Sequence, residues 1–152
     1  MLSKPYYGWS DFKLDGTSTY SLSYLDDIAF EWLDVAMHGL KTKKPFCVKG
    51  FMEPNRFLCV VSYYNCYVVI EEEWKDTSTK ESVRIESSPT TMVDFCRCLH
   101  KDISEYIEEW ASFSCDCFND EVIEENIKTL QEKLEEFHKM IVIEDNCRGV
   151  YL

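Results

Sequence analysis

The sequence predicts a single α+β domain over residues 1–152: an N-terminal helix on a four-stranded antiparallel sheet, followed by a C-terminal acidic helical hairpin. Three observations predict this class. Apolar residues recur with helical spacing over 23–41, strand-forming segments joined by short turns fill 45–87, and helical spacing returns over 88–143. A chain of 152 residues that is 45% hydrophobic is long enough and apolar enough to bury one core.

Residues 1–22 are expected to form an aromatic arm laid over the domain, because aromatic and turn residues dominate them and Asp15-Gly16 is a clear turn. The first helix is expected over 23–41, with Ser23 as its N-cap. Its apolar residues repeat three and four positions apart along one face: Leu25, Ile28, Ala29, Trp32, Leu33, Ala36, Met37 and Leu40.

Four strands are expected between 45 and 87. Segments 45–52, 56–63 and 66–70 are rich in β-branched and aromatic residues and are separated by short turns. The last strand is short, with Val83 and Ile85 expected to face the core. Short connections between neighbouring strands favour an antiparallel meander.

The hairpin over 88–143 begins at Ser88, a predicted N-cap followed by Pro89 at the first helical position. Its second helix begins near Asn119 or Asp120 and carries a heptad seam: Ile123, Ile127, Leu130, Leu134, Phe137 and Ile141. Because the linker between the two helices is short, the seam is expected to pack against the preceding helix. Pairing of the seam with a second copy is the alternative.

The negative charge of the protein is concentrated in its last third. The net charge is −12, and the segment from Asp102 to Asp145 holds fourteen carboxylates and three lysines, a net charge of −11. Such a field repels nucleic acid and anionic membranes and attracts basic proteins. Nucleic acid and anionic membranes are therefore excluded as partners, and a basic protein is favoured.

Clustered cysteines suggest a metal site, which the spacing argues against. Cys96 and Cys98 point to opposite sides of a helix, so they cannot bind one ion there. Cys96 with His100 is separated from Cys115 and Cys117 by about 28 Å of helix at 1.5 Å per residue. The eight cysteines are expected to be reduced, and no metal or cofactor is expected.

Catalytic motifs are not evident in the sequence. Exposed cysteines lie among acidic residues, which suppress the reactive thiolate. Paired glutamates are expected on solvated faces, and there is no glycine-rich phosphate loop or nucleophile elbow. We expect a protein that is not an enzyme. An unrecognised site built from Asp11, Asp15, tyrosines and His100 stays open as an alternative.

The first residues contain no apolar run typical of a signal peptide, and no stretch is long enough to span a membrane. A soluble, cytoplasmic protein is therefore expected.

The chain is small and rich in aromatic residues, and its pI is near 4.6. It also has acidic patches at 71–73, 105–109 and 121–125. In these respects the chain resembles the immunity proteins of bacterial contact-dependent and other polymorphic toxin systems. The resemblance implies one-to-one binding and neutralisation of a cognate toxin domain, often a nuclease with a basic cleft. The predicted partner-binding residues are Glu71, Glu72, Glu73, Trp74, Glu105, Glu108, Glu109, Glu121, Glu124 and Glu125.

Aromatic side chains near these acids are the predicted anchors of the interface. They are Tyr106 and Trp110 on the helices, or Tyr63, Tyr64, Tyr67 and Trp74 at the sheet edge, each with a core role as the alternative. A monomer is expected when the heptad seam packs within the chain, and a dimer when the protein is instead a self-associating module.

Overall fold

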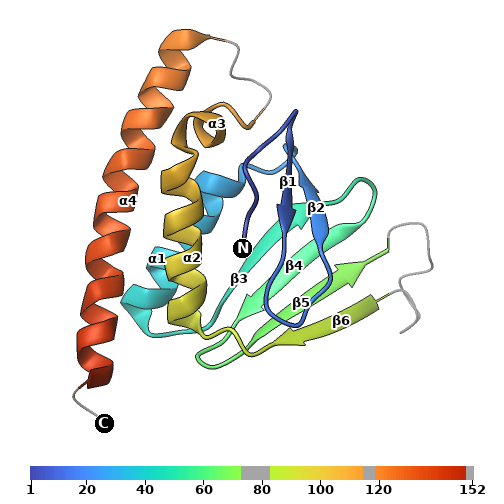
Figure 1. Ribbon diagram of the computed structural model, residues 1–152, viewed down its shortest axis with the longest axis vertical. Coiled ribbons are helices and arrows are strands. Elements are labelled where there is room, and N and C mark those ends of the chain that lie inside the picture. Colours follow the sequence, from blue (N-terminus) through green and yellow to red (C-terminus); the bar gives the residue numbers. More distant parts are fainter. Residues whose placement is uncertain (73–82, 115–118, 150–152) are drawn as a thin grey trace.

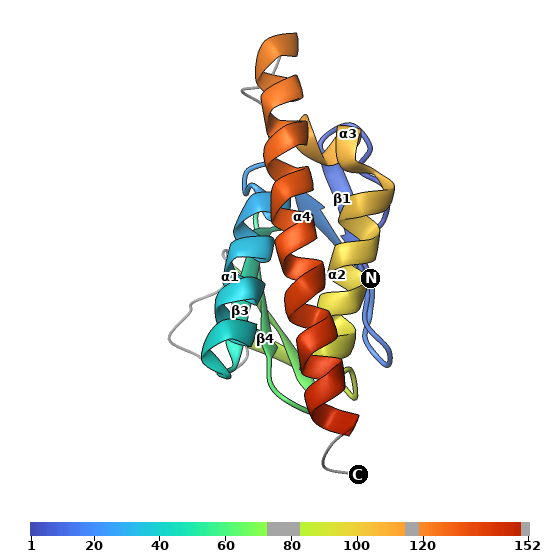
Figure 2. The same ribbon diagram turned by 90° about the vertical axis from the view of Figure 1, so that its left-hand side faces the viewer.

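The computed structural model describes residues 1–72, 83–114 and 119–149, arranged in three layers (Figure 1). A four-stranded sheet forms one layer, two helices and a small β-hairpin cover one of its faces, and the longest helix lies outside those helices (Figure 2). In chain order the elements are β1 (Trp9–Phe12), β2 (Tyr20–Ser23), α1 (Ile28–Thr42), β3 (Phe46–Phe51), β4 (Arg56–Val61), β5 (Cys66–Glu71), β6 (Val83–Ser88), α2 (Met92–Glu105), α3 (Ile107–Ala111) and α4 (Asp120–Gly149).

The α+β class is observed, but the predicted order of elements is wrong. The first helix follows two strands, because residues 9–23 form an antiparallel hairpin rather than an irregular arm. The hairpin is held by burial: Phe12 is fully buried, and its ring lies 4.8 Å from that of Phe57 and 5.8 Å from that of Trp32. Its apolar face thus forms part of the core between the sheet and α1.

Helix α1 begins at Ile28, five residues later than predicted, because Ser23 is the last residue of β2 and is fully buried. The helix ends at Thr42, its C-cap Lys43 adopts a left-handed conformation, and the Lys44 N–H donates to the Gly39 carbonyl at 3.1 Å. The Trp32 indole N–H donates to the Lys49 carbonyl at 2.8 Å, which fixes α1 on β3.

The large sheet is the predicted antiparallel meander, with strand order β3-β4-β5-β6. On its inner face the side chains of Phe57, Cys59, Val68 and Ile70 are buried beneath α1, α2 and the hairpin. The outer face is exposed or half-buried although many of its residues are apolar: Cys47, Phe51, Leu58, Val60, Tyr67, Val69, Val83 and Ile85.

The predicted facing of the last strand is wrong. Val83 and Ile85 lie on the outer face with 38% and 64% of their surface exposed, whereas Arg84 and Glu86 lie on the inner side. The reason is the neighbour: the inner side of β6 meets polar groups of the hairpin. Glu86 accepts hydrogen bonds from the Ser18 hydroxyl at 2.7 Å and the Tyr20 hydroxyl at 2.5 Å.

The helical part also differs from the prediction. Ser88 ends β6, and Thr91 is the N-cap of α2, accepting from the Asp94 N–H at 3.2 Å. The expected continuous helix breaks at Tyr106. Beyond the break, the Trp110 indole turns back to donate to the Asp102 carbonyl at 3.2 Å.

Helix α4 packs across α1, α2 and α3 rather than against one preceding helix, so the predicted two-helix hairpin is wrong (Figure 2). Four of the six seam residues are buried in the core, with Leu130 and Phe137 fully buried, and Ile123 and Ile127 are half-buried against it. Ion pairs of Lys133 with Asp34 of α1 and of Arg97 of α2 with Asp145 flank the seam. The buried part of the seam therefore packs within the chain.

Candidate functional site

The predicted partner-binding residues do not form one surface. Glu71 ends β5 and Glu72 follows it, at the end of the sheet away from the helices, whereas the other described members lie on α2, α3 and α4 (Figure 1). Glu73 and Trp74 lie outside the described residues. The proposed continuity between the acidic helices and that sheet edge is thus absent among the residues that the structure describes.

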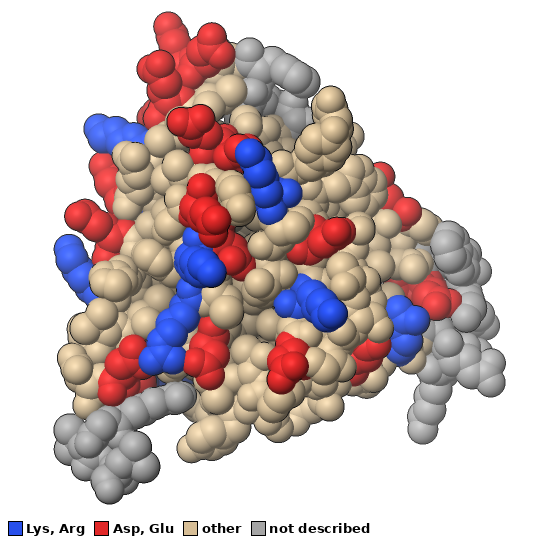
Figure 3. Space-filling view, viewed as in Figure 1, with Lys and Arg blue, Asp and Glu red and all other residues tan. Residues whose placement is uncertain are grey.

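The helical members do lie together, where α2, α3 and the beginning of α4 meet. In the sequence no Lys or Arg occurs from Asp102 to Ile127, which includes nine carboxylates. Six of them are exposed and form no salt bridge with any described residue, and we refer to them as the acidic end: Glu105, Glu108, Asp120, Glu121, Glu124 and Glu125. Figure 3 shows acidic side chains gathered where α4 begins.

Glu109 differs from these six because it has a cationic partner. The Lys4 ammonium lies 2.7 Å from its carboxylate and 5.5 Å from the centre of the Tyr106 ring. The hydrogen bond with Lys4 holds the pKa of Glu109 below its ordinary value, and the same bond raises the pKa of Lys4. This pair attaches the N-terminal segment to α3 at the border of the acidic end.

Two exposed tyrosines stand beside this border, at the tip of a tight turn. The Tyr6 N–H donates to the Trp9 carbonyl at 2.8 Å and the Trp9 N–H donates back at 3.0 Å, with φ of 47° at Tyr7 and 77° at Gly8. These are the features of a type I′ turn. Gly8 is required there, since a Cβ would lie 2.7 Å from the Tyr24 ring.

The two tyrosine rings contact each other at a centroid distance of 4.2 Å, and 71% of Tyr6 and 85% of Tyr7 are exposed. A hollow of about 290 Å³ connects them to α3, lined by Pro5, Tyr6, Tyr7, Gly8, Glu109, Ser112 and Phe113. We refer to Tyr6 and Tyr7 as the tyrosine turn. The tyrosine turn was not predicted as a surface feature, and Gly8 is the one turn signal that the sequence offers there.

The predicted aromatic anchors are either buried or lie away from the acidic end. Trp110 is 1% exposed, so it belongs to the core, and Tyr106 is half-buried beneath Lys4. Tyr63, Tyr64 and Tyr67 are exposed but lie on the sheet and its β4–β5 turn, away from the acidic end.

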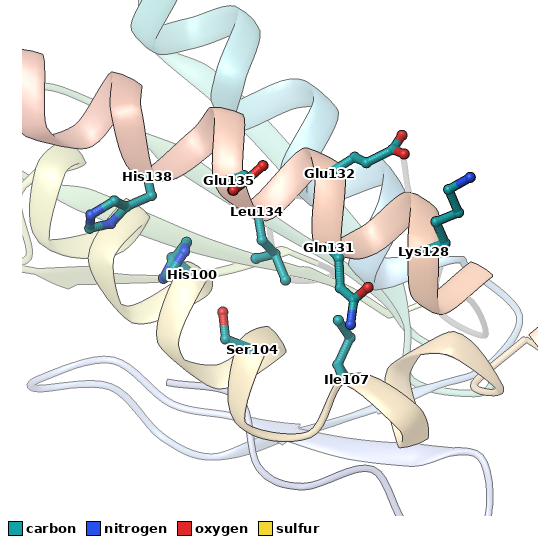
Figure 4. A pocket seen from close by; sticks show the side chains of 9 residues that line it. All are labelled: His100, Ser104, Ile107, Lys128, Gln131, Glu132, Leu134, Glu135 and His138. Atoms are coloured by element: carbon teal, nitrogen blue, oxygen red, sulfur yellow. The ribbon is translucent and has the colours of Figure 1, made fainter. Parts of the chain in front are cut away.

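A groove of about 780 Å³ separates α2 and α3 from α4 (Figure 4). Ile107 and Leu134 form its apolar floor, and its polar residues are His100, Ser104, Lys128, Gln131, Glu132, Glu135 and His138. The two imidazoles face each other from α2 and α4 with ring centroids 5.3 Å apart.

The chemistry of this groove is limited. Burial and the neighbouring His138 lower the pKa of His100 below its ordinary value of 6.5, while hydrogen bonding to the Leu134 backbone acts in the opposite direction. His100 is therefore neutral at neutral pH. No third ligand joins the two histidines, and no cluster of three metal-ligating side chains exists among the described residues.

The alternative catalytic site is not assembled. Asp11 lies on β1, where it accepts from the Ser21 hydroxyl, and Asp15 lies in the β1–β2 turn, whereas His100 faces α4. Burial raises the pKa of the Cys96 thiol, and a hydrogen bond with Cys66 together with burial raises the pKa of the Cys59 thiol, so Cys59 and Cys96 stay protonated. Cys115 and Cys117 lie outside the described residues.

Comparison with protein-family models, curated proteins and solved structures finds no match for this chain. No helix in the described part of the chain is long and apolar enough to cross a membrane.

Proposed function

We propose that the protein is an inhibitor of the immunity type, which binds a basic protein domain, such as a nuclease toxin, and blocks its active site. It acts by contact and not by catalysis. The proposed contact surface consists of the acidic end and the tyrosine turn, which adjoin at Glu109 and Lys4.

One observation carries this proposal: two largely exposed tyrosines stand beside a surface of six exposed carboxylates that form no salt bridge with any described residue. Tyrosine is enriched among the residues that contribute most to binding free energy, because it brings a large apolar area with few rotatable bonds. Carboxylates around such an anchor raise the association rate with a basic partner and reject acidic partners.

A purely structural role accounts for part of the acidic end. Asp120 and Glu121 lie in the first turn of α4, where negative charge stabilises the helix dipole. Glu108 is likewise in the first turn of α3, but the effect does not extend beyond a first turn. Glu105, which ends α2, and Glu124 and Glu125, which lie further along α4, therefore do not share it. It also gives no reason for a tyrosine pair to remain in solvent.

The first test is capture of the partner. Immunity genes usually lie directly downstream of the toxin gene, so the product of the upstream neighbouring gene is the probe. We expect a one-to-one complex in which the activity of that product is lost. Absence of binding to it would contradict the immunity assignment.

The second test concerns the surface. Replacing Tyr6 and Tyr7 by Ala is expected to weaken this complex by about thirtyfold or more, since an anchor tyrosine contributes ~2 kcal/mol or more. Tyr64→Ala is the matched control, because Tyr64 is equally exposed on a different part of the molecule. An equal loss from the control would assign the contact to the sheet instead.

A further inference from the structure

Strand β6 is the edge of the large sheet, and its hydrogen-bonding direction follows from the register. The Ser62 N–H donates to the Asn65 carbonyl at 2.9 Å, so by alternation Tyr67, Val69 and Glu71 bond to β4. The intervening residues of β5 then bond to Arg84, Glu86 and Ser88. The backbone N–H and C=O groups of Val83, Ile85 and Ser87 consequently point out of the sheet.

These outward groups have no hydrogen-bond partner in the described part of the chain. Natural edge strands are commonly protected by Pro, Lys, a bulge, inward-pointing charges or a covering element. β6 contains no Pro or Lys and pairs with β5 in regular register, and Ile85 is its most exposed apolar residue. Its inward-pointing charges are Arg84 and Glu86, which oppose pairing with most strands but complement each other across a two-fold axis. In Figure 1 no described element runs along its outer side.

We propose that a second copy of this chain pairs with β6 in antiparallel orientation, with the two-fold axis at Ile85. In this register the N–H and C=O of Ile85 bond to Ile85 of the second copy, and Val83 pairs with Ser87. All the outward backbone groups of the strand are then satisfied. The two four-stranded sheets become one sheet of eight strands.

The charges of the strand favour this register. A register shifted by one residue is not compatible with the strand. The two-fold axis places Arg84 opposite Glu86 of the second copy, and Glu86 opposite its Arg84, which are attractive cross-strand pairs. A shift by one residue would place outward backbone groups against inward ones. The strand is thus complementary to itself in both hydrogen bonding and charge, as an isologous interface requires.

The hairpin holds these two side chains at the inner side of the edge. Glu86 is bound by the Ser18 N–H at 2.9 Å and by the Tyr20 hydroxyl, and the Arg84 guanidinium lies 5.7 Å from the centre of the Tyr20 ring. Both charges are therefore ordered before pairing, and little side-chain entropy is lost on association. This inference does not depend on the proposed inhibitory function, because it uses a different part of the molecule.

Sedimentation velocity over a concentration series tests the pairing. We expect the wild-type protein to shift reversibly from the 18.0 kDa monomer to a species of twice that mass. R84E places like charges in both cross-strand pairs and is expected to weaken the dimer about tenfold, and the exchange R84E/E86R to restore it. A wild-type protein that stays monomeric, or a dimer indifferent to R84E, overturns the proposal.

Ile85→Pro provides a second variant that keeps the fold. The Ile85 N–H points away from β5, so proline removes the outward donor without breaking a bond of the sheet. We expect this variant to be monomeric with an unchanged circular dichroism spectrum. Val60→Lys, which alters the same outer face away from the edge, is the control and should remain dimeric. A dimer that persists in Ile85→Pro, or dissociates equally in Val60→Lys, would contradict edge pairing.

Discussion

At the scale of single residues, Gly39 shows how packing overrides helical preference. It lies within α1, where alanine would ordinarily stabilise the helix by about 1 kcal/mol. A Cβ at this position would lie 2.3 Å from Cδ1 of Phe46, a buried ring on β3. The absence of a side chain is what allows α1 to approach the sheet this closely.

Gly39→Ala is therefore expected to destabilise the protein by about 1–3 kcal/mol, the usual result of overpacking a core. Urea denaturation measures the change. Adding Phe46→Leu should recover part of the loss, since it removes the ring that collides with the new methyl group. A more stable Gly39→Ala variant would show that α1 packs differently from the structure described.

His100 makes stability depend on pH. Because its pKa is lowered in the folded protein by burial and by His138, the unfolded chain takes up the proton first as the pH falls. Its contribution to the free energy of unfolding is complete above pH 6.5 and is lost below it. Glu135 and Lys128 also line the groove, but neither is among the causes of the lowered pKa of His100.

We expect the melting temperature of the wild-type protein to fall between about pH 7.5 and pH 5.5 by more than that of His100→Gln. His138→Gln should reduce the fall as well, because one source of the lowered pKa is gone. An equal fall in melting temperature for the wild-type protein and His100→Gln between the two pH values would contradict this assignment.

Residue chemistry alone predicted helix caps poorly. Ser23 and Ser88 have the side chain of an N-cap, yet both are nearly or fully buried at the ends of strands. Each precedes a helix by a few residues, so the prediction that a helix follows is confirmed, whereas the predicted first residue of that helix is wrong. The actual cap of α2, Thr91, is chemically no different from Ser88, and only the strand pairing separates them.

At the scale of elements, α4 packs through the seam that the sequence predicts. The helices against which it packs could not be predicted from the sequence. Four seam residues are buried against α1 and α2. A heptad pattern states which side of a helix is apolar and not what covers it. Helix α1 is about ninety positions away in the chain, so no local rule could name it as a partner.

Phe137→Ala tests this packing. It is expected to lower the free energy of unfolding by about 3–5 kcal/mol, the cost of a large buried side chain, without changing the oligomeric state. Val142→Ala, on the exposed side of the same helix, should change it by less than about 0.5 kcal/mol. Urea denaturation and sedimentation measure the two quantities, and loss of a dimer in Phe137→Ala would indicate that the seam joins two copies.

The strands differ in how far sequence predicts them. Alternation in β5 predicts that Cys66, Val68 and Ile70 share one face, and in the structure that face is buried. The strands β1 and β2, of four residues each, are too short and too rich in serine to stand out. In β6 the apolar residues were assigned to the core, since the sequence does not show that the polar hairpin covers the inner side of that strand.

At the scale of the whole molecule, acidic residues gather at one end, as the uneven distribution of charge along the sequence predicts. The described residues of the segment from Asp102 to Ile127, which lacks Lys and Arg, lie at one end of the helical layers and form an acidic surface there. The acids of α4 beyond it are interspersed with lysines and ion pairs. The charge pattern of the sequence therefore predicts the helical part of the acidic surface, but not the tyrosine turn beside it.

The most direct test of the central claim is the salt dependence of the association rate between this protein and its captured partner, measured by stopped flow. Glu121→Gln, Glu124→Gln and Glu125→Gln together should slow association about tenfold at low salt and flatten its dependence on salt. The matched control neutralises Glu132, Glu135 and Glu136, three exposed acids further along the same helix. It should leave the rate within about twofold of wild type. Equal effects from both sets, or none from either, would contradict binding through the acidic end.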